Sequence, residues 1–239
     1  MIKMANTKSV IVAQKTNGSL AGLYDAVRDD PEIREYLALA DEHLGSIGFT
    51  EHGIRHGAKV AKWAGEILSA LKRPAEEIEL ACIAGLLHDI GNFICREDHG
   101  QTGANLLYQI LRRHAFSIRQ LGLVLSAVGN HEEQYGQVYN TICAAVMIAD
   151  KSDVHRSRVR NYDPSRGDMH DNVNYAVTES KLVVDAAVRE IRLELKIDDT
   201  IASVMDYFEI FLSRMVMCRN AAAFLGCEFH ISCNGRSIS

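Results

Sequence analysis

The sequence has little proline and no strong excess of charge of either sign. Only three prolines occur in 239 residues, at positions where a helix would begin or a loop would turn, namely Pro31, Pro74 and Pro164. The formal net charge of −5 offers no basic field of the kind that nonspecific nucleic-acid binding requires. We therefore expect a small-molecule partner and no nucleic acid.

Long apolar runs and paired cysteines are also missing. No run approaches the roughly 18 residues of a membrane span, and the N-terminus lacks the apolar core and cleavage site of a signal peptide. The six cysteines form no CxxC pair, and several lie within apolar runs, which is typical of a reducing compartment. No GxGxxG or Walker loop occurs. A cytoplasmic protein without a membrane partner is expected.

What is present is a helical pattern from residue 31 to about residue 160. The segment 52–71, for example, repeats apolar residues at helical spacing on a face that also carries His52 and His56. Helices are expected over 31–44, 52–71, 73–89, 101–113, 117–129 and 141–159. The hydrophobic content of 47% is ample for a sizeable core.

The pattern changes after Arg160. A polar loop is expected over 160–172, and residues 188–198 alternate as a half-buried strand does, with 182–185 as a hairpin partner. A helix over 199–225, ended by Gly226, then precedes a last strand over 227–233. That helix serves either the core or a homodimer interface. The prediction is a mainly α fold with a small C-terminal α+β extension, divided into 1–30, 31–160 and 161–239.

Polar residues occupy several positions where the helical periodicity predicts apolar ones. His88 and Asp89 end the buried helix, His56 shares a stripe with Val60, and Asp150 lies on an apolar face. Neighbouring side chains on a helix point about 100° apart, so one cavity holds both His88 and Asp89 only if they bind something between them. A metal ion fits, because it compensates polar groups that are costly to bury.

Three segments in this order resemble the HD-domain superfamily of metal-dependent phosphohydrolases, whose pattern is H…HD…D. They are RHGAKVAKWA around His56, AGLLHDIGN around His88 and Asp89, and MIADKSD around Asp150. The resemblance covers roughly residues 45–160 and implies an HD-type helical bundle.

Two later segments, DHGQTGANLL and GNHEEQYG, resemble those that give two-metal HD proteins further ligands. The HD-GYP phosphodiesterases are among these proteins. His99 and His131 take the ligand positions, and the resemblance then implies two metals bridged by Asp89.

The sequence also departs from the HD-GYP pattern. It has HDIGN where those proteins typically have HDIGK, and QYGQVYN in place of the GYP signature, which argues against cyclic di-GMP as the substrate. His52 stands where some of those sites have a glutamate for a third metal, so two metals are expected. His52 itself is expected either at the rim of the site or as a further ligand.

The resemblance implies a phosphomonoesterase or phosphodiesterase that acts on a nucleotide or cyclic dinucleotide by attack of a metal-bridging hydroxide. Imidazole and carboxylate ligands suit Fe or Mn, with Zn, Co and Ni as alternatives. Asp89 and Lys151 are the candidate catalytic residues, and Arg156 and Arg158 are candidate substrate-binding residues, unless these arginines only form a solvated helix end. Two alternatives stay open: an HD-type di-iron oxygenase, and a nucleotide-sensing module with little turnover.

Overall fold

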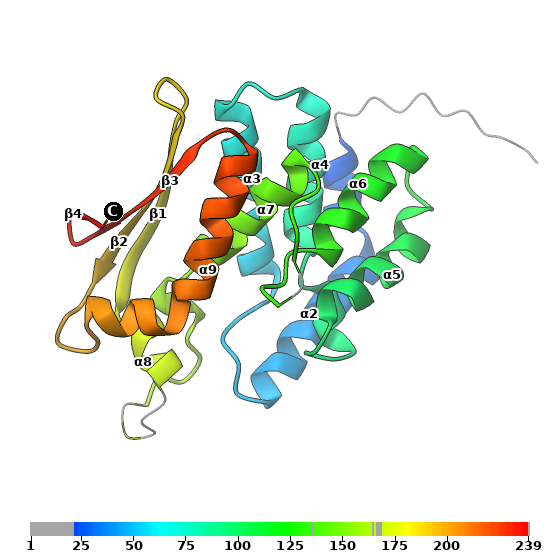
Figure 1. The fold of residues 1–239 in the computed structure, drawn as a ribbon. Coiled ribbons are helices and arrows are strands. Elements are labelled where there is room, and N and C mark those ends of the chain that lie inside the picture. Colours follow the sequence, from blue (N-terminus) through cyan, green and yellow to red (C-terminus); the bar gives the residue numbers. More distant parts are fainter. Residues whose placement is uncertain (1–21, 135, 164, 166–168, 239) are drawn as a thin grey trace, which may run out of the picture.

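The computed structural model describes residues 22–134, 136–163, 165 and 169–238, which form a helical bundle with a four-stranded sheet at one side (Figure 1). This confirms the predicted mainly α fold with a small α+β extension. The predicted N-terminal segment 1–30, with a weak strand at 9–13, lies outside the described residues as far as residue 21. The helical elements are α1 (Leu23–Arg28), α2 (Pro31–Ser46), α3 (Ile54–Ala70), α4 (Ala75–Leu87), η1 (Ile90–Phe93), α5 (His99–Leu111), α6 (Ile118–Gly129), α7 (Thr141–Ser152), η2 (Arg156–Arg158), α8 (Met169–Ala176) and α9 (Val204–Phe224). The strands are β1 (Val177–Asp185), β2 (Glu190–Ile197), β3 (Glu228–Cys233) and β4 (Arg236–Ile238).

Local sequence signals explain several helix ends. The Asp30 side chain accepts hydrogen bonds from the amides of Glu32 and Ile33, and a proline opens α2. Ser117 forms a capping box at the start of α6, and Ser203 forms one at the start of α9. These caps satisfy amide groups that have no partner within the helix, so they fix where each helix begins.

Several predicted boundaries are wrong, and α9, for example, begins at Val204 and not at residue 199. The helix expected over 141–159 ends at Ser152, because Asp153 leaves the helical conformation with φ −84° and ψ 80° and turns a fully buried carboxylate toward α3. The loop expected over 160–172 includes the first residues of α8, which starts at Met169. Val173 and Ala176 of this helix are buried in one cluster with residues of α9, and this tertiary contact outweighs the polar local sequence.

The sheet has the strand order β1-β2-β3-β4. The predicted hairpin is confirmed, since β1 and β2 pair antiparallel, and β2 shows the expected alternation of buried and outward residues. Strand β3 pairs parallel with β2, and α9 forms the connection between them. The short strand β4, which the sequence analysis did not predict, pairs antiparallel with β3.

The buried apolar residues form two clusters, and α9 contributes to both. Met217 and Ala221 belong to the cluster inside the helical bundle, whereas Tyr207 and Phe211 belong to the cluster shared by the sheet and α8. Figure 1 accordingly shows α9 between the sheet and the other helices. Among the described residues, no helix has both the length and the apolar character needed to cross a membrane.

Helices α3 and α4 approach each other unusually closely. A Cβ atom added to Gly57 would lie 2.7 Å from the carbonyl oxygen of Leu86, and one added to Gly85 would lie 2.9 Å from the Cα atom of Ala61. Real Cβ atoms do not come this close to backbone atoms, so small residues are required at the contact. The contact sets the distance between His56 on α3 and His88 at the end of α4.

We expect Gly85→Ala to lower the free energy of unfolding. Overpacking against the backbone costs about 1–3 kcal/mol, more than the roughly 1 kcal/mol that alanine gains in helix propensity. Gly122→Ala on α6 is the matched control, because an added Cβ there meets nothing within 4 Å and should stabilise the protein. Urea denaturation of both variants measures the difference, and equal stability of the two would contradict the close approach of α3 and α4.

Candidate metal centre

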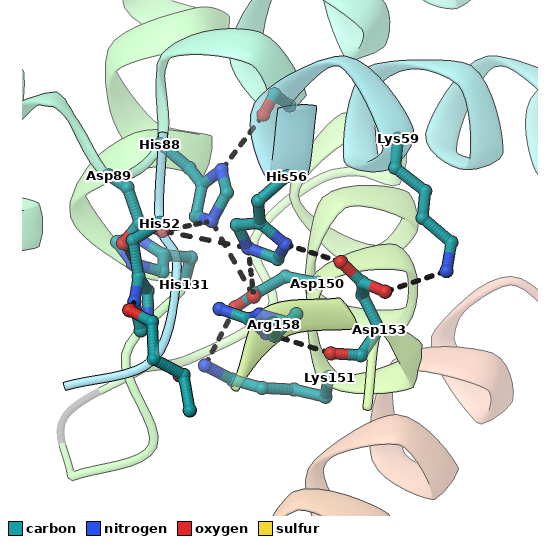
Figure 2. Close-up of polar contacts among 12 residues, drawn as sticks. His52, His56, Lys59, His88, Asp89, His131, Asp150, Lys151, Asp153 and Arg158 are labelled. Atoms are coloured by element: carbon teal, nitrogen blue, oxygen red, sulfur yellow. Dashed lines mark hydrogen bonds and ion pairs between the residues drawn. The ribbon is translucent and has the colours of Figure 1, made fainter. Parts of the chain in front are cut away.

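The structure brings the six predicted metal ligands together in the helical bundle, and each is at most 8% exposed. They come from separate elements, and Figure 2 shows His56, His88, Asp89, His131 and Asp150. His56 lies on α3, His88 follows the last residue of α4, Asp89 precedes η1, His99 begins α5, His131 follows α6, and Asp150 lies on α7. Segments nearly a hundred residues apart in the sequence therefore meet at one buried point.

The carboxylate of Asp89 lies between two groups of imidazoles. Its Oδ2 atom is 3.0 Å from Nε2 of His88 and 3.6 Å from Nε2 of His56. Its Oδ1 atom is 3.2 Å from Nε2 of His99 and 3.7 Å from Nε2 of His131. Asp150 completes the first group, because its Oδ1 atom lies 3.2 Å from Nε2 of His56 and 3.5 Å from Nε2 of His88.

All four imidazoles are oriented through their other ring nitrogen. A backbone carbonyl accepts from Nδ1 in three of them: Gly85 for His88 at 2.8 Å, Arg96 for His99 at 3.0 Å and Val128 for His131 at 2.6 Å. In the fourth, a carboxylate oxygen of Asp153 lies 2.7 Å from Nδ1 of His56. Because carbonyl oxygens only accept, Nδ1 carries a proton in the first three, so in the neutral tautomer the Nε2 lone pair points into the centre.

This arrangement fits bound cations. Nε2 of His88 and Oδ2 of Asp89 are buried and have no hydrogen-bond partner among the described residues, which is costly unless a cation compensates them. The Nε2 atoms of His99 and His131 lie only 2.9 Å apart, although both nitrogens present lone pairs in this tautomer. The donor atoms form two groups that could hold a metal ion, His56 with His88 and Asp150, and His88 with Asp89 and His131. Imidazole and carboxylate without thiolate suit first-row divalent metals.

Both carboxylates of the centre are held in their ionised form by positive neighbours. Burial opposes the charge of Asp89, but the positive charge of His88 and nearby hydrogen bonds outweigh it, so the pKa of this carboxyl lies well below its usual range. The pKa of Asp150 is likewise far below normal, because Lys151 and His88 outweigh its burial. Burial would lower the pKa of His88, yet Asp89 and Asp150 raise it to about 10. Two ionised carboxylates among imidazole nitrogens are a ligand set that suits divalent cations.

Three residues that support the ligands were not predicted to act in the site. Asp153 binds His56 with one oxygen and receives a hydrogen bond from Lys59 at 2.7 Å with the other. The side chain of Glu132 accepts from the amide of Gly100 at 2.5 Å, and its second oxygen is 3.2 Å from Nδ1 of His99. The Asn92 amide donates to Oδ1 of Asp89 at 3.0 Å. Each of the three is within three residues of a predicted ligand, and this proximity was the available signal.

The glycine after the His-Asp pair allows the next ligand to come close. A Cβ atom on Gly91 would collide with the carbonyl oxygen of His99 and would lie 2.6 Å from the amide nitrogen of Gly103. Helix α5 can therefore begin directly against η1 only because residue 91 has no side chain. This explains why HDIG is followed so soon by a helix that begins with a ligand.

A cavity of about 300 Å³ opens beside the ligands. The predicted residues Lys151 and Arg158 line it, as does His52. Nζ of Lys151 is 2.8 Å from Oδ2 of Asp150, and Arg158 is held by the carbonyl oxygens of Glu51 and Asp153 (Figure 2). Arg96 and Arg214, which were not predicted, also line the cavity.

Arg156, the second predicted substrate-binding residue, is not among the residues that line this cavity. Its guanidinium carbon lies 4.7 Å from the ring centroid of Tyr175, which in turn stacks on Tyr162. The structure thus places Arg156 against Tyr175 of α8, whereas Arg158 lies at the site.

The fold and the site define a helical protein with a candidate metal-binding centre built from histidine and aspartate side chains. Comparison with known proteins agrees, since the family described as the HD domain matches residues 53–155. Residues 53–155 thus form an HD domain, which confirms the resemblance inferred from the motifs.

Individual relatives cover only part of the molecule. Ribonuclease Y of Enterococcus faecalis is 33% identical over 113 residues, which are 44% of this chain and 19% of that protein. Ribonuclease Y of Oceanobacillus iheyensis is 31% identical over 101 residues, 42% of this chain and 17% of that protein. The chain thus spans under a fifth of the length of these relatives. A crystal structure of a predicted HD superfamily hydrolase from an uncultured Thermotogales bacterium is 26% identical, with a TM-score of 0.41 over 58% of this chain and 75% of that one.

We expect two metal ions per chain, and we expect the number of ions lost to depend on which ligand is removed. Asp89→Ala should bind neither ion, because both groups of imidazoles use this carboxylate, whereas His131→Ala should keep the ion held by His56, His88 and Asp150. Elemental analysis after gel filtration gives the stoichiometry, with the exposed His170→Ala as control. One metal in both the wild type and His131→Ala would contradict the two-group arrangement.

Asp153→Asn should weaken metal binding although Asp153 is not itself a predicted ligand. Carboxylates that orient a ligating imidazole typically contribute about 10–100-fold in metal affinity. Competition with a chelating dye measures the affinity, and Asp185→Asn in the β1–β2 turn serves as control because an amide oxygen can accept the same turn hydrogen bonds. Unchanged affinity in Asp153→Asn would show that the position of His56 does not depend on this contact.

Proposed function

We propose that this protein is a metal-dependent phosphohydrolase that cleaves a phosphate ester of a small molecule, with a nucleotide or cyclic dinucleotide as the substrate class. The observation that carries this proposal is the position of Asp89, whose two carboxylate oxygens face two separate groups of imidazole nitrogens. A carboxylate so placed fits a pair of cations a few ångströms apart, and paired cations suit displacement at phosphorus.

The residues that would hold the cations are the six predicted ligands, with Asp89 shared between the two positions. Divalent cations in such a centre supply Lewis acidity toward phosphoryl oxygens and lower the pKa of a water that serves as nucleophile. The protein keeps the donor atoms in place through the Nδ1 contacts of each histidine and through Asn92, which holds Asp89. The ligands are therefore organised before substrate arrives.

Lys151 and Arg158 would bind the phosphate. The ammonium group of Lys151 lies beside Asp150, so a phosphate at the metal centre comes within its reach. Arg158 is fixed because Nη1 donates to the carbonyl of Asp153 at 2.7 Å and Nε donates to that of Glu51 at 3.0 Å. These contacts leave Nη2 available to an anion in the cavity, and fixed cations stabilise the charge that develops in the transition state.

The size of the cavity and the names of the relatives support this substrate class. About 300 Å³ is at the lower end of typical small-molecule sites, so it accommodates part or all of a nucleotide. The matched relatives are called ribonucleases, and a ribonuclease acts on phosphodiester bonds. Because the matches cover less than half of this chain and under a fifth of those proteins, what they contribute here is the bond type.

Hydrolysis of a panel of phosphate esters by metal-replete protein tests the proposal. The panel includes p-nitrophenyl phosphate, bis-p-nitrophenyl phosphate, nucleotides, cyclic dinucleotides and a short RNA. We expect activity on at least one ester, loss of activity in Asp89→Ala, and a fall in kcat of about 10²–10³-fold in Lys151→Met. Lys62→Met on the exposed face of α3 is the matched control.

Two outcomes would count against hydrolysis. Consumption of dioxygen by the di-iron protein, without release of phosphate or nucleotide products, would favour the oxygenase alternative. Tight nucleotide binding with no product after long incubation would favour the sensing module.

A further inference from the structure

Helix α9 contributes to the wall of the catalytic cavity although it lies outside the residues that match the HD domain. Arg214 on this helix lines the cavity together with Lys151 and Arg158. Figure 1 shows α9 running alongside α7, the helix that carries Asp150 and Lys151. The C-terminal extension therefore supplies a cation to a site whose ligands all come from the helical bundle.

The guanidinium group of Arg214 is held on one side only. Its Nε donates to Oε1 of Glu133 at 2.9 Å, and its central carbon lies 4.5 Å from the ring centroid of Phe211. The hydroxyl of Ser213 donates to the other oxygen of Glu133 at 2.9 Å. These contacts occupy Nε and one face of the guanidinium plane, and within the described part of the chain Nη1 and Nη2 form no hydrogen bond. An arginine fixed in this way presents two donors in the geometry that suits a phosphate.

The cations of the cavity follow each other outward from the ligands. Lys151 lies 2.8 Å from Asp150 and 3.7 Å from Oε1 of Glu133, and Arg214 binds the same Glu133 oxygen. Lys151 thus lies next to the candidate metal centre. Arg214 lies farther out, because Glu133 stands between it and Lys151. A phosphate that is cleaved at the centre would contact Lys151. Arg214 would then be free to bind a different group of the same molecule.

We propose that Arg214 binds a second anionic group of the substrate, so that α9 selects molecules with two phosphate groups, such as a nucleoside diphosphate or a dinucleotide. This inference rests on the proposed phosphohydrolase function, because it takes the first phosphate to lie at the metal centre. The C-terminal extension then acts as the specificity element of the enzyme. The simpler explanation is that Arg214 only ties α9 to the loop that carries Glu133.

Binding of two non-substrate anions to the manganese-loaded protein separates these explanations. Inorganic phosphate carries one phosphoryl group, and methylenebisphosphonate carries two that cannot be hydrolysed apart. Isothermal titration calorimetry should show that Arg214→Met weakens binding of the bisphosphonate about tenfold or more, as expected for a lost hydrogen bond to a charged group. Affinity for inorganic phosphate should change less than about twofold, since Lys151 and the metals still bind it.

Two control variants test whether the effect comes from misfolding or from loss of the ion pair between Arg214 and Glu133. Arg219→Met removes an exposed arginine from the same helix and should change neither affinity. Glu133→Gln breaks the ion pair but keeps the guanidinium, so bisphosphonate affinity should stay at least as high as in the wild type. If Arg214→Met does not fold, Glu133→Gln decides between the two explanations.

The inference is overturned if Arg214→Met weakens the binding of both anions equally or of neither. It is also overturned if Glu133→Gln reproduces the loss of bisphosphonate binding. Failure of the proposed function looks different, because the ester panel would then show no hydrolysis while the calorimetric difference between the two anions persisted.

Discussion

The site depends first on how closely α3 and α4 approach. Two helices come this near only where neither has a side chain in the way, and here Gly57 and Gly85 meet backbone atoms of the opposite helix. This contact places His56 next to His88, with ring centroids 5.1 Å apart. Since Asp150 bridges those two imidazoles, the position of α7 is set by the same contact. A wider spacing of α3 and α4 would separate the first group of donors.

The second constraint is that two buried carboxylates lie among four imidazoles. Burial makes their charge costly, and the protein offsets the cost by fixing each imidazole so that one nitrogen faces inward. Without a metal, His88 carries the compensating charge, as its raised pKa shows. A bound metal would take over that role, so metal binding and deprotonation of His88 are linked. Much of the stability of this region is therefore tied to cations.

The sequence was sufficient to predict which histidine and aspartate side chains meet in the bundle, but it was insufficient to predict the residues that support them. His56, His88 and Asp150 were recognisable because each interrupts an apolar stripe, and the order of the motifs added His99 and His131. Asp153 was not recognised, because the predicted helix continued through it, and only its tertiary contact with His56 shows why the helix ends at Ser152. The predicted roles of Asp89, Lys151 and Arg158 are hypotheses that the geometry supports. Arg156 and Arg158 are only two residues apart, yet their side chains point to different parts of the molecule.

Arg214 shows what local sequence cannot convey. Nothing in the residues around it marks it as part of a site, because its partner Glu133 and its neighbour Lys151 come from distant segments. Its position is nevertheless well determined. Helix α9 connects the parallel strands β2 and β3, so the sheet holds it on one side through Tyr207 and Phe211, while Met217 and Ala221 hold it in the bundle core on the other. A helix buried on two sides has little freedom to move, and a side chain on its remaining face keeps a fixed distance from the candidate ligand Asp150 on α7. The sheet, which contributes no predicted ligand, therefore matters to the site because it anchors the helix that carries Arg214.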